Sequence, residues 1–403
     1  MLPVWAPDNV EPMQTNRLLV GVPRETFPGE TRVALVPAVL PQLTKAGMGV
    51  IVESRAGEAA GFADEQYVAH GAEIGNRERV FKADIVAQVR TCGANPELGR
   101  DDIHRFREEQ VIAGMADPLV CPAGVRQAAE HKVIAFAMDF MPRITRAQGM
   151  DVLSSQATVI GYKAVLMAAD RLPKMFPMMT TAAGTVPPVQ LFVIGAGVAG
   201  LTAIATARRL GAVVQAYDVR PAAQEDIESL GARCVLLQLQ PGDAEDQAGY
   251  ARELGEAFYA RQQELMAQVV AGVDVVITTA LIPGRKAPVL VTEQAVKGMQ
   301  PGSVIVDCAA ERGGNCEMTR PNHRTVTDNG VTIFGPTNLA ASVPHEASMM
   351  YAKNMSAFLM LLVKDGALDI DMDDEIVRGT LVTRGGEVTH KRVIEALSEV
   401  QDG

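Results

Sequence analysis

The sequence predicts an α/β fold with two Rossmann-like, doubly wound parallel sheets in two lobes, the second inserted into the first. Three observations support this prediction: a length of 403 residues, short apolar runs that alternate with helix-length segments, and two long helical stretches. A chain of this length exceeds one typical domain and accommodates two or three. Strands spaced by helices are typical of βαβ units, and therefore of parallel sheets.

The first series of strands begins close to the N-terminus. Apolar runs predict strands at Leu18–Val22, Val50–Glu53, Ile85–Val89, Val111–Gly114 and Val133–Phe136, with a helix at Pro37–Ala46 after the first strand. Since helix-length segments separate these runs, we expect them to form one parallel sheet.

A second series of strands follows in the middle of the chain. It comprises Val189–Ile194, Val213–Tyr217, Val273–Thr278, Ser303–Asp307 and Val331–Phe334, and long helices at Asp151–Met175 and Ala341–Lys364 bracket it. We therefore predict a discontinuous N-terminal domain of residues 1–150 plus 341–403. Residues 151–340 are predicted to form the inserted domain.

Composition excludes several classes of function. The net charge of −11 argues against a surface for nucleic acid or anionic lipid. Aromatic residues make up only 4%, which argues against base-stacking platforms. The five cysteines are scattered without zinc spacing, which favours a reducing cytoplasm. No segment is expected to supply the apolar length of a membrane span or to act as a signal peptide, so no direct membrane insertion is expected.

The strongest motif is the run from Gly195 to Gly200, GAGVAG, which follows an apolar strand and opens a helix at Leu201–Leu210. Its first glycine lets the chain turn out of the strand, its second admits a pyrophosphate close to the backbone, and its third allows tight helix packing. The helix N-terminus offers N–H groups to the phosphates.

Asp218 ends the next strand, where an acceptor for the ribose hydroxyls belongs. This combination predicts a Rossmann NAD(H) site. A carboxylate would repel a 2′-phosphate, so NAD is favoured over NADP. Arg220 argues in the other direction, because a nearby arginine can accept that phosphate.

A second polar constellation precedes the long interlobe helix. It runs from Arg143 through Arg146, Gln148 and Asp151 to Ser154, and its position at a domain boundary places it at the cleft. On composition alone, a helix N-cap with a solvated turn explains these residues better than a functional site does.

Five stretches of the chain resemble one family. They are GVPRETFPGETRVALVP, RITRAQGMDVLSSQATVIGYKAV, VIGAGVAGLTAIATARRLGAVVQAYDVRPA, TTALIPGRKAPVLVTEQAV and MDDEIVRGTLVTRGGEVTH. Across nearly its whole length the chain resembles the NAD(H)-binding component, domain I, of proton-translocating NAD(P) transhydrogenases. The first stretch is shared with alanine dehydrogenase and saccharopine-type dehydrogenases, whereas the arginine–glutamine–aspartate loop and the C-terminal tail are not.

The resemblance implies a role for each matching residue. Arg143 would hold the nicotinamide carboxamide and pair with Asp151, Gln148 would bridge toward a second nicotinamide, and Ser154 would contact the ring. These four are the expected catalytic residues. The implied nucleotide contacts are Gln148, Gly149, Met150, Asp151, Gly195, Gly197, Val198, Ala199, Gly200, Asp218, Val219, Arg220, Gly249, Tyr250, Gln262 and Leu281. Gly249 and Tyr250 match the family's mobile loop.

The resemblance also implies partners. Hydride would pass directly between NAD(H) bound here and NADP(H) bound by a second component, coupled to proton translocation by a membrane-spanning component. The chain would be a homodimer in the cytoplasm, peripheral to the inner membrane through those partners. Two positions depart from the family: Gly149 stands where serine is expected, and Arg312 where a small residue is usual.

The main alternative is an alanine dehydrogenase-like amino-acid oxidoreductase. That chemistry needs a proton acceptor beside the substrate, a lysine or histidine of the first lobe. The expected lysine position holds Gln88, and the segment Val111–Leu119 holds no histidine. Direct transfer between two nicotinamides needs no such base, only rings held at contact distance. A non-catalytic NAD-binding module is the third alternative. Without its partners the chain would act in this way, since it would bind NAD(H) but would not turn over.

Overall fold

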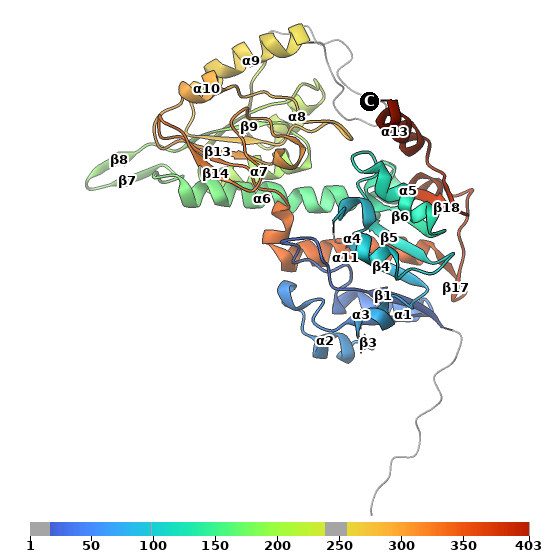
Figure 1. Ribbon diagram of the computed structural model, residues 1–403. Coiled ribbons are helices and arrows are strands. Elements are labelled where there is room, and N and C mark those ends of the chain that lie inside the picture. The colour runs from blue at the N-terminus through green and yellow to red at the C-terminus, as the bar shows by residue number, and fades with distance from the viewer. Residues whose placement is uncertain (1–16, 98, 238–255, 403) are drawn as a thin grey trace, which may run out of the picture.

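The computed structural model describes residues 17–97, 99–237 and 256–402. Two large sheets with their covering helices form two lobes, which we call the first and second lobe (Figure 1). The chain has a mixed α/β fold in which parallel strands dominate both sheets, as the sequence predicts. The expected mobile-loop residues Gly249 and Tyr250 lie outside the described residues.

The first sheet has eight strands in the order β19-β18-β6-β5-β4-β1-β2-β3. Its strands are β1 (Leu18–Val22), β2 (Met48–Glu53), β3 (Glu73–Gly75), β4 (Ile85–Arg90), β5 (Val111–Met115), β6 (Ile134–Ala137), β18 (Leu381–Arg384) and β19 (Glu387–Val388). β1 to β6 run parallel, and the C-terminal pair β18 and β19 adds an antiparallel edge. Its strand order reverses between β1 and β4, where ligands of such sheets bind.

The second sheet has seven strands in the order β11-β10-β9-β12-β13-β15-β14. They are β9 (Gln190–Ile194), β10 (Val213–Tyr217), β11 (Arg233–Cys234), β12 (Val275–Thr278), β13 (Val304–Asp307), β14 (Arg324–Val326) and β15 (Thr332–Phe334). Only β14 is antiparallel. The order reverses between β9 and β12, so the loops that leave these two strands form the expected crevice.

Helices complete both lobes. Those of the first lobe are α1 (Leu40–Lys45), α2 (Asp64–Ala69), α3 (Arg77–Val80), α4 (Gly99–Ile103), α5 (Pro122–Glu130), α12 (Glu375–Thr380) and α13 (Lys391–Asp402). Those of the second lobe are α7 (Val198–Arg209), α8 (Ala223–Ser229), α9 (Glu256–Ala271) and α10 (Glu293–Lys297). Buried Val, Ile and Leu of the strands form the core of each lobe.

Two long helices join the lobes. α6 (Val152–Arg171) starts in the core of the first lobe with Val152 and continues into the core of the second with Ala164 and Val165. α11 (Pro344–Leu361) returns the chain to the first core. Figure 1 shows α6 running along the boundary between the lobes.

The structure corrects one expectation and adds two hairpins that the sequence did not predict. α6 is long and apolar enough to cross a membrane by length and composition, whereas the sequence was expected to hold no such segment. Part of its apolar surface packs into the cores of both lobes, whereas Leu153 and Tyr162 are exposed. The added hairpins are β7 (Met179–Thr181) with β8 (Gly184–Val186), and β16 (Val363–Lys364) with β17 (Ala367–Leu368).

Candidate functional site

The turn after β9 holds its glycines where a dinucleotide turn needs them. Gly195 has a left-handed φ of 96°, and its N–H donates to the Tyr217 carbonyl at 2.8 Å. A Cβ on Gly200 would lie 1.8 Å from the Gly195 carbonyl oxygen, so only glycine fits there. A Cβ on Gly197 would meet no atom within 4 Å, which leaves open space before α7. The turn therefore suits a pyrophosphate at a helix N-terminus.

Asp218 lies against this turn, one residue past β10. Its carboxylate accepts from the Ala196 N–H at 2.7 Å and from the Arg220 N–H at 2.9 Å. The Arg220 guanidinium also binds it, at 3.0 Å from Nε and 3.1 Å from a terminal nitrogen. Asp218 therefore fixes the turn and pairs with the arginine, while Val219 between them is half-buried. This pairing reduces the negative charge that a 2′-phosphate would meet.

Residues of β12 and α9 close two sides of the same turn. The Thr279 hydroxyl donates to the Gly195 carbonyl at 3.0 Å, which ties the loop after β12 to the turn. Leu281, two residues further, is exposed. Gln262 is buried, and its amide donates to the Tyr217 hydroxyl at 2.8 Å. These contacts place the loop that carries Leu281 next to the glycine turn.

The polar loop before α6 has a capping function as well as exposed groups. It contains the 3₁₀ turn η5 (Thr145–Met150). Asp151 caps α6, since its carboxylate accepts from the Ser154 N–H at 3.0 Å and from the Ser154 hydroxyl at 2.5 Å. Arg146 forms two hydrogen bonds to Asp374, at 2.7 and 2.9 Å. The helix-cap interpretation is therefore correct for Asp151 and Ser154, whereas Arg146 instead pairs with the N-cap residue of α12.

Gln148 is the residue of this loop that capping does not explain. Its side chain is exposed and makes no hydrogen bond within the part of the chain that the structure describes. The neighbouring Gly149 carbonyl accepts from Asn354 of α11 at 2.8 Å, and Met150 packs against the first core. Arg143 is exposed on the segment that leads into the loop, and its expected pair with Asp151 stays a prediction.

α6 sets the spacing between the loop and the glycine turn. A Cβ on Gly161 would lie 2.1 Å from the Ala199 carbonyl oxygen, so α6 packs directly on the first turn of α7. The rise of an α-helix over the nine residues from Val152 to Gly161 is about 14 Å. The loop that carries Gln148 and the glycine turn therefore lie at two separate points along one helix, as the two halves of an extended dinucleotide would require.

Sequence reasoning missed a buried polar cluster between the lobes, which we call the interlobe cluster: Glu30, Arg32, Arg90, Gln156 and Asn338. Arg32 is 2.6 Å from Glu30 and donates to Gln156 at 2.8 Å and to Asn338 at 2.9 Å. Arg90 is 3.2 Å from Glu30 and donates to Asn338 at 3.0 Å. The cluster thus joins the first sheet's β1 and β4 loops to α6 and to the segment after β15. The segment 21–37 carries four charged residues next to the apolar run Val33–Val36, but this pattern does not indicate which distant residues they contact.

The pKa values of three buried carboxyl groups in the first lobe are shifted in different directions. Burial alone would raise the pKa of Glu30, but hydrogen bonds and charge from Arg32 lower it to about 2. Burial raises the pKa of Glu25 to about 8, and the Glu30 charge adds to this. Burial also raises the pKa of Asp139 to about 6. Because Glu25 and Asp139 are enclosed and bonded to backbone N–H groups, neither is placed as a proton acceptor for an open cleft.

Comparisons with known proteins match one family over both lobes. Residues 21–160 match the family described as alanine dehydrogenase/PNT, N-terminal domain, and residues 164–391 match its C-terminal domain. The chain is 42% identical over 381 residues to the first part of NAD(P) transhydrogenase subunit alpha from Rickettsia prowazekii, and the match covers 94% of this chain and 98% of that protein.

Two further comparisons separate the branches of this family. A solved structure of transhydrogenase from Sinorhizobium meliloti is 43% identical, with a TM-score of 0.81, and the match covers 92% of this chain and 99% of that one. An alanine dehydrogenase from Staphylococcus saprophyticus is 30% identical over 390 residues, with 94% of this chain and 97% of that protein covered. The chain is thus more similar to the transhydrogenases of this set than to that dehydrogenase.

Proposed function

The chain belongs to the alanine dehydrogenase/PNT family, and from that membership we propose that it is the NAD(H)-binding component of a transhydrogenase. A hydride, carrying two electrons, passes directly between NAD(H) bound here and NADP(H) bound by a partner component. A membrane-spanning partner couples this transfer to proton translocation. The observation that carries the proposal is that one helix, α6, joins an open dinucleotide turn to an exposed polar loop.

The glycine turn and its neighbours would hold the adenosine and pyrophosphate half of the nucleotide. The N-terminus of α7, from Val198 through Ala199 to Gly200, would offer N–H groups to the phosphates, and Gly197 just before it leaves open space. Asp218 and Arg220 lie against the same turn, where the ribose hydroxyls would be bound. These contacts favour NAD(H) over NADP(H). Arg220 would reduce this preference for NAD(H) without reversing it.

The loop before α6 would hold the nicotinamide half. Arg143 would bind the carboxamide, and Ser154, fixed by its hydrogen bonds to Asp151, would contact the ring. Gln148 would orient this nicotinamide against that of the partner, because its side chain is exposed and has no structural bond among the described residues. Catalysis then consists of orienting two rings at contact distance, which supplies much of the rate when no proton is removed.

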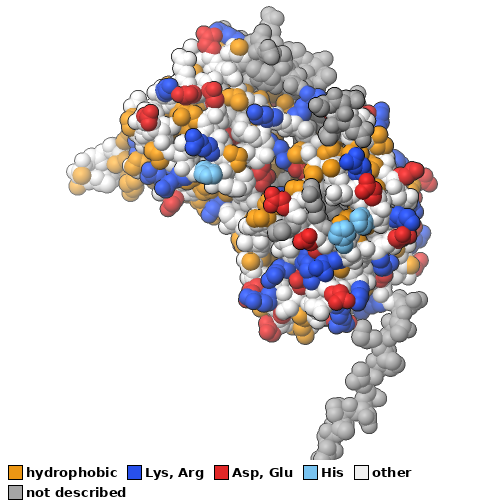
Figure 2. Space-filling view, in the orientation of Figure 1, with side chains coloured by type: hydrophobic (Ala, Val, Ile, Leu, Met, Phe, Trp, Pro, Cys, Tyr) orange, Lys and Arg blue, Asp and Glu red, His pale blue; other side chains and the backbone are white. Residues whose placement is uncertain are grey.

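Assembly with other chains follows from the same proposal. The hairpin β7–β8 projects from the second lobe and stands clear of the surface around it (Figures 1 and 2). Met178 and Met179 at its start are 64% and 39% exposed, which is unusual for large apolar side chains. We propose that the hairpin contacts a second copy in a homodimer, located at the cytoplasmic side of the inner membrane through its partners.

The same sheets support the proposed division of the chain into domains. Residues 151–340 would form the nucleotide-binding domain, because they hold all strands of the second sheet. Residues 1–150 and 341–403 would form the other, because the C-terminal strand β18 pairs with β6.

A mixing assay tests the proposed function. The chain is combined with membranes that contain the NADP(H)-binding and membrane-spanning components, and reduction of NADP⁺ by NADH is followed. We expect hydride transfer only when the chain and the NADP(H)-binding component are both present, and no formation of NADH from L-alanine and NAD⁺. Steady NADH formation from alanine by the chain alone would instead assign it to the amino-acid oxidoreductases, and no transfer in the complete mixture would reject the proposal.

A further inference from the structure

Arg312 of the second lobe reaches across the boundary between the lobes. It ends the 3₁₀ turn η6 (Ala310–Arg312), which follows β13 of the second sheet. Its guanidinium forms an ion pair with Asp117, in the loop after β5 of the first sheet. Both side chains are about one-third exposed, at 29% and 30%. The pair therefore links the two lobes directly at the carboxyl ends of their strands.

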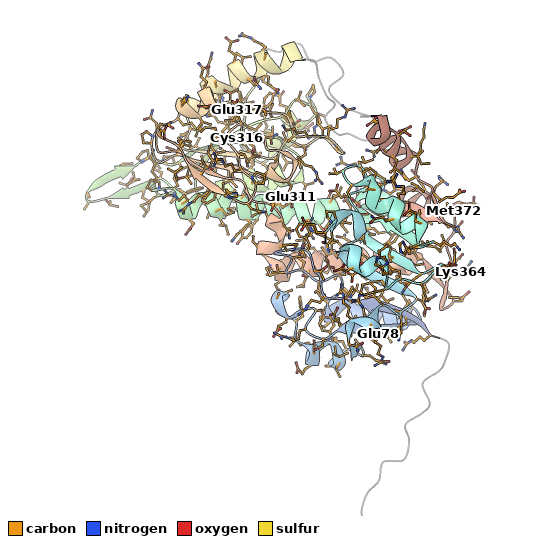
Figure 3. All side chains as sticks on the ribbon, in the orientation of Figure 1. Glu78, Glu311, Cys316, Glu317, Lys364 and Met372 are labelled. Atoms are coloured by element: carbon orange, nitrogen blue, oxygen red, sulfur yellow. The ribbon has the colours of Figure 1, made fainter. Side chains whose placement is uncertain are left out.

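The preceding residue of η6 makes a second contact across the boundary. The Glu311 carboxylate accepts from the Asn338 N–H at 2.7 Å and lies 3.4 Å from the Arg90 guanidinium. Figure 3 shows Glu311 where the second lobe meets the first. One short turn thus holds the first lobe at two points, and one of them, Arg90, belongs to the interlobe cluster.

The Asp117 side of the contact is held rigidly. Asp117 has a left-handed φ of 47°, a conformation that Asp and Asn tolerate better than most residues. Its N–H and that of Ala116 both donate to the buried Asp139 carboxylate, at 2.7 and 3.0 Å. The ion pair with Arg312 is therefore made to a fixed point of the first lobe and not to a freely moving side chain.

η6 is also connected to the loop that carries Leu281. The Ala287 N–H donates to the Arg312 carbonyl at 2.8 Å, which attaches the end of that loop to η6. A Cβ on Gly284 would lie 2.8 Å from the Cβ of Leu119, so the same loop abuts the first lobe two residues past Asp117. Movement of η6 away from Asp117 would consequently move the loop beside the glycine turn.

We propose that η6 is an interlobe latch, in which Arg312 pairs with Asp117 to hold the two lobes together and to position the loop 281–287. Arg312 is a positioning residue, which acts through that loop on a bound nucleotide. The effect on nucleotide release rests on the proposed NAD(H) site, whereas the effect on loop 281–287 does not.

Two substitutions break the latch in different ways. Arg312→Ala removes the cation, and Asp117→Asn removes the anion while it keeps a residue that tolerates the left-handed backbone. Lys297→Ala is the matched control, because Lys297 pairs with Glu293 inside one exposed helix of the second lobe. Two readouts are measured: hydrogen exchange of segment 281–287 without nucleotide, and the dissociation rate of NADH by stopped flow.

We expect Arg312→Ala and Asp117→Asn each to speed exchange in 281–287 and to raise the NADH dissociation rate by about two- to fivefold, the range for a partly exposed ion pair. The double variant should exceed neither single one, since both remove the same interaction, and Lys297→Ala should match the parent. Unchanged exchange in 281–287, or fully additive effects, would overturn the latch. If the unmodified chain bound no NADH, the proposed function would be wrong. The hydrogen-exchange measurement on 281–287 would still test the latch.

Discussion

The glycine turn at Gly195–Gly200 and the polar loop at Arg143–Asp151 both lie beside α6, but the chain constrains them to different degrees. The backbone of the turn is packed too closely for any residue other than glycine at position 200. A Cβ on Gly200 would lie only 1.8 Å from the Gly195 carbonyl oxygen. In the loop, a Cβ on Gly149 would meet nothing within 4 Å, and the Gln148 side chain is exposed. Nucleotide binding is thus built into the fold, whereas orientation toward a partner depends on side chains that the fold leaves free.

The largest expected effect comes from adding one methyl group to the constrained region. Gly200→Ala places a Cβ against the Gly195 carbonyl and forces the turn and α7 apart. We expect loss of measurable NADH binding and a lower melting temperature of the second lobe, because overpacking against backbone has no side chain to relax. Titration calorimetry with NADH and a thermal melt check both effects.

The matched control adds the same methyl group to the open region. Gly149→Ala meets no protein atom within 4 Å and keeps the backbone groups with which Gly149 would contact the nucleotide. We therefore expect an unchanged melting temperature and a far smaller loss of NADH affinity than in Gly200→Ala. If the two alanine variants bound NADH equally well, the contrast between the constrained turn and the open loop would be wrong.

A second prediction concerns the exposed amide of the loop. Gln148→Asn shortens the side chain by one methylene, and we expect it to slow hydride transfer about a hundredfold, since a misplacement of about 1 Å can cost that much. NADH affinity should stay within a few-fold, because the residue acts on the transition state more than on ground-state binding. Single-turnover transfer in the reconstituted complex, beside an NADH titration, measures the two quantities separately.

Arg143→Ala serves as the comparison for Gln148→Asn. It should weaken both NADH binding and transfer, because it removes a proposed contact with the carboxamide. A normal transfer rate in Gln148→Asn would mean that the loop is only the entry to α6, as its capping contacts alone suggest.

The smallest of these effects is expected at Asp218. Asp218→Ala removes a carboxylate that holds both Ala196 and Arg220, and we expect NADH binding to weaken about tenfold, the loss typical of hydrogen bonds to a charged group. The preference over NADPH should narrow, because Arg220 is released to meet a 2′-phosphate. Parallel titrations with NADH and NADPH decide this, and equal or tighter NADPH binding by the unmodified chain would contradict it.

The parts of the molecule that could be predicted from the sequence are those set by local patterns. The strands Leu18–Val22 and Val213–Tyr217 were predicted to the residue, because their apolar runs are short and sharply bounded. The fold class follows from the same alternation of strands and helices. The hairpin Met179–Val186 was missed, because it carries no apolar periodicity and its residues are exposed.

The candidate site also contains some parts that local sequence patterns predict and others that they do not. The glycine turn and Asp218 belong to one βαβ unit, which brings the end of its second strand beside the turn, and the Ala196 N–H donates to the Asp218 carboxylate. The interlobe cluster and the contact of Arg312 with Asp117 join residues that are distant in sequence, and no local pattern indicates such pairs. The N-cap role of Asp151 was open from the sequence, and the structure assigns it by the two bonds to Ser154.

Transfer of an isotope label tests most directly whether the chain presents NAD(H) to a second nucleotide. NADH deuterated at the transferred position of C4 is mixed with NADP⁺ and the complete set of components, and the NADPH formed is analysed by mass spectrometry. Our account predicts that the deuterium appears in NADPH without loss to water, since the hydride passes directly between the two rings. NADPH that lacks the label, or that takes up deuterium from heavy water when the NADH is unlabelled, would contradict it.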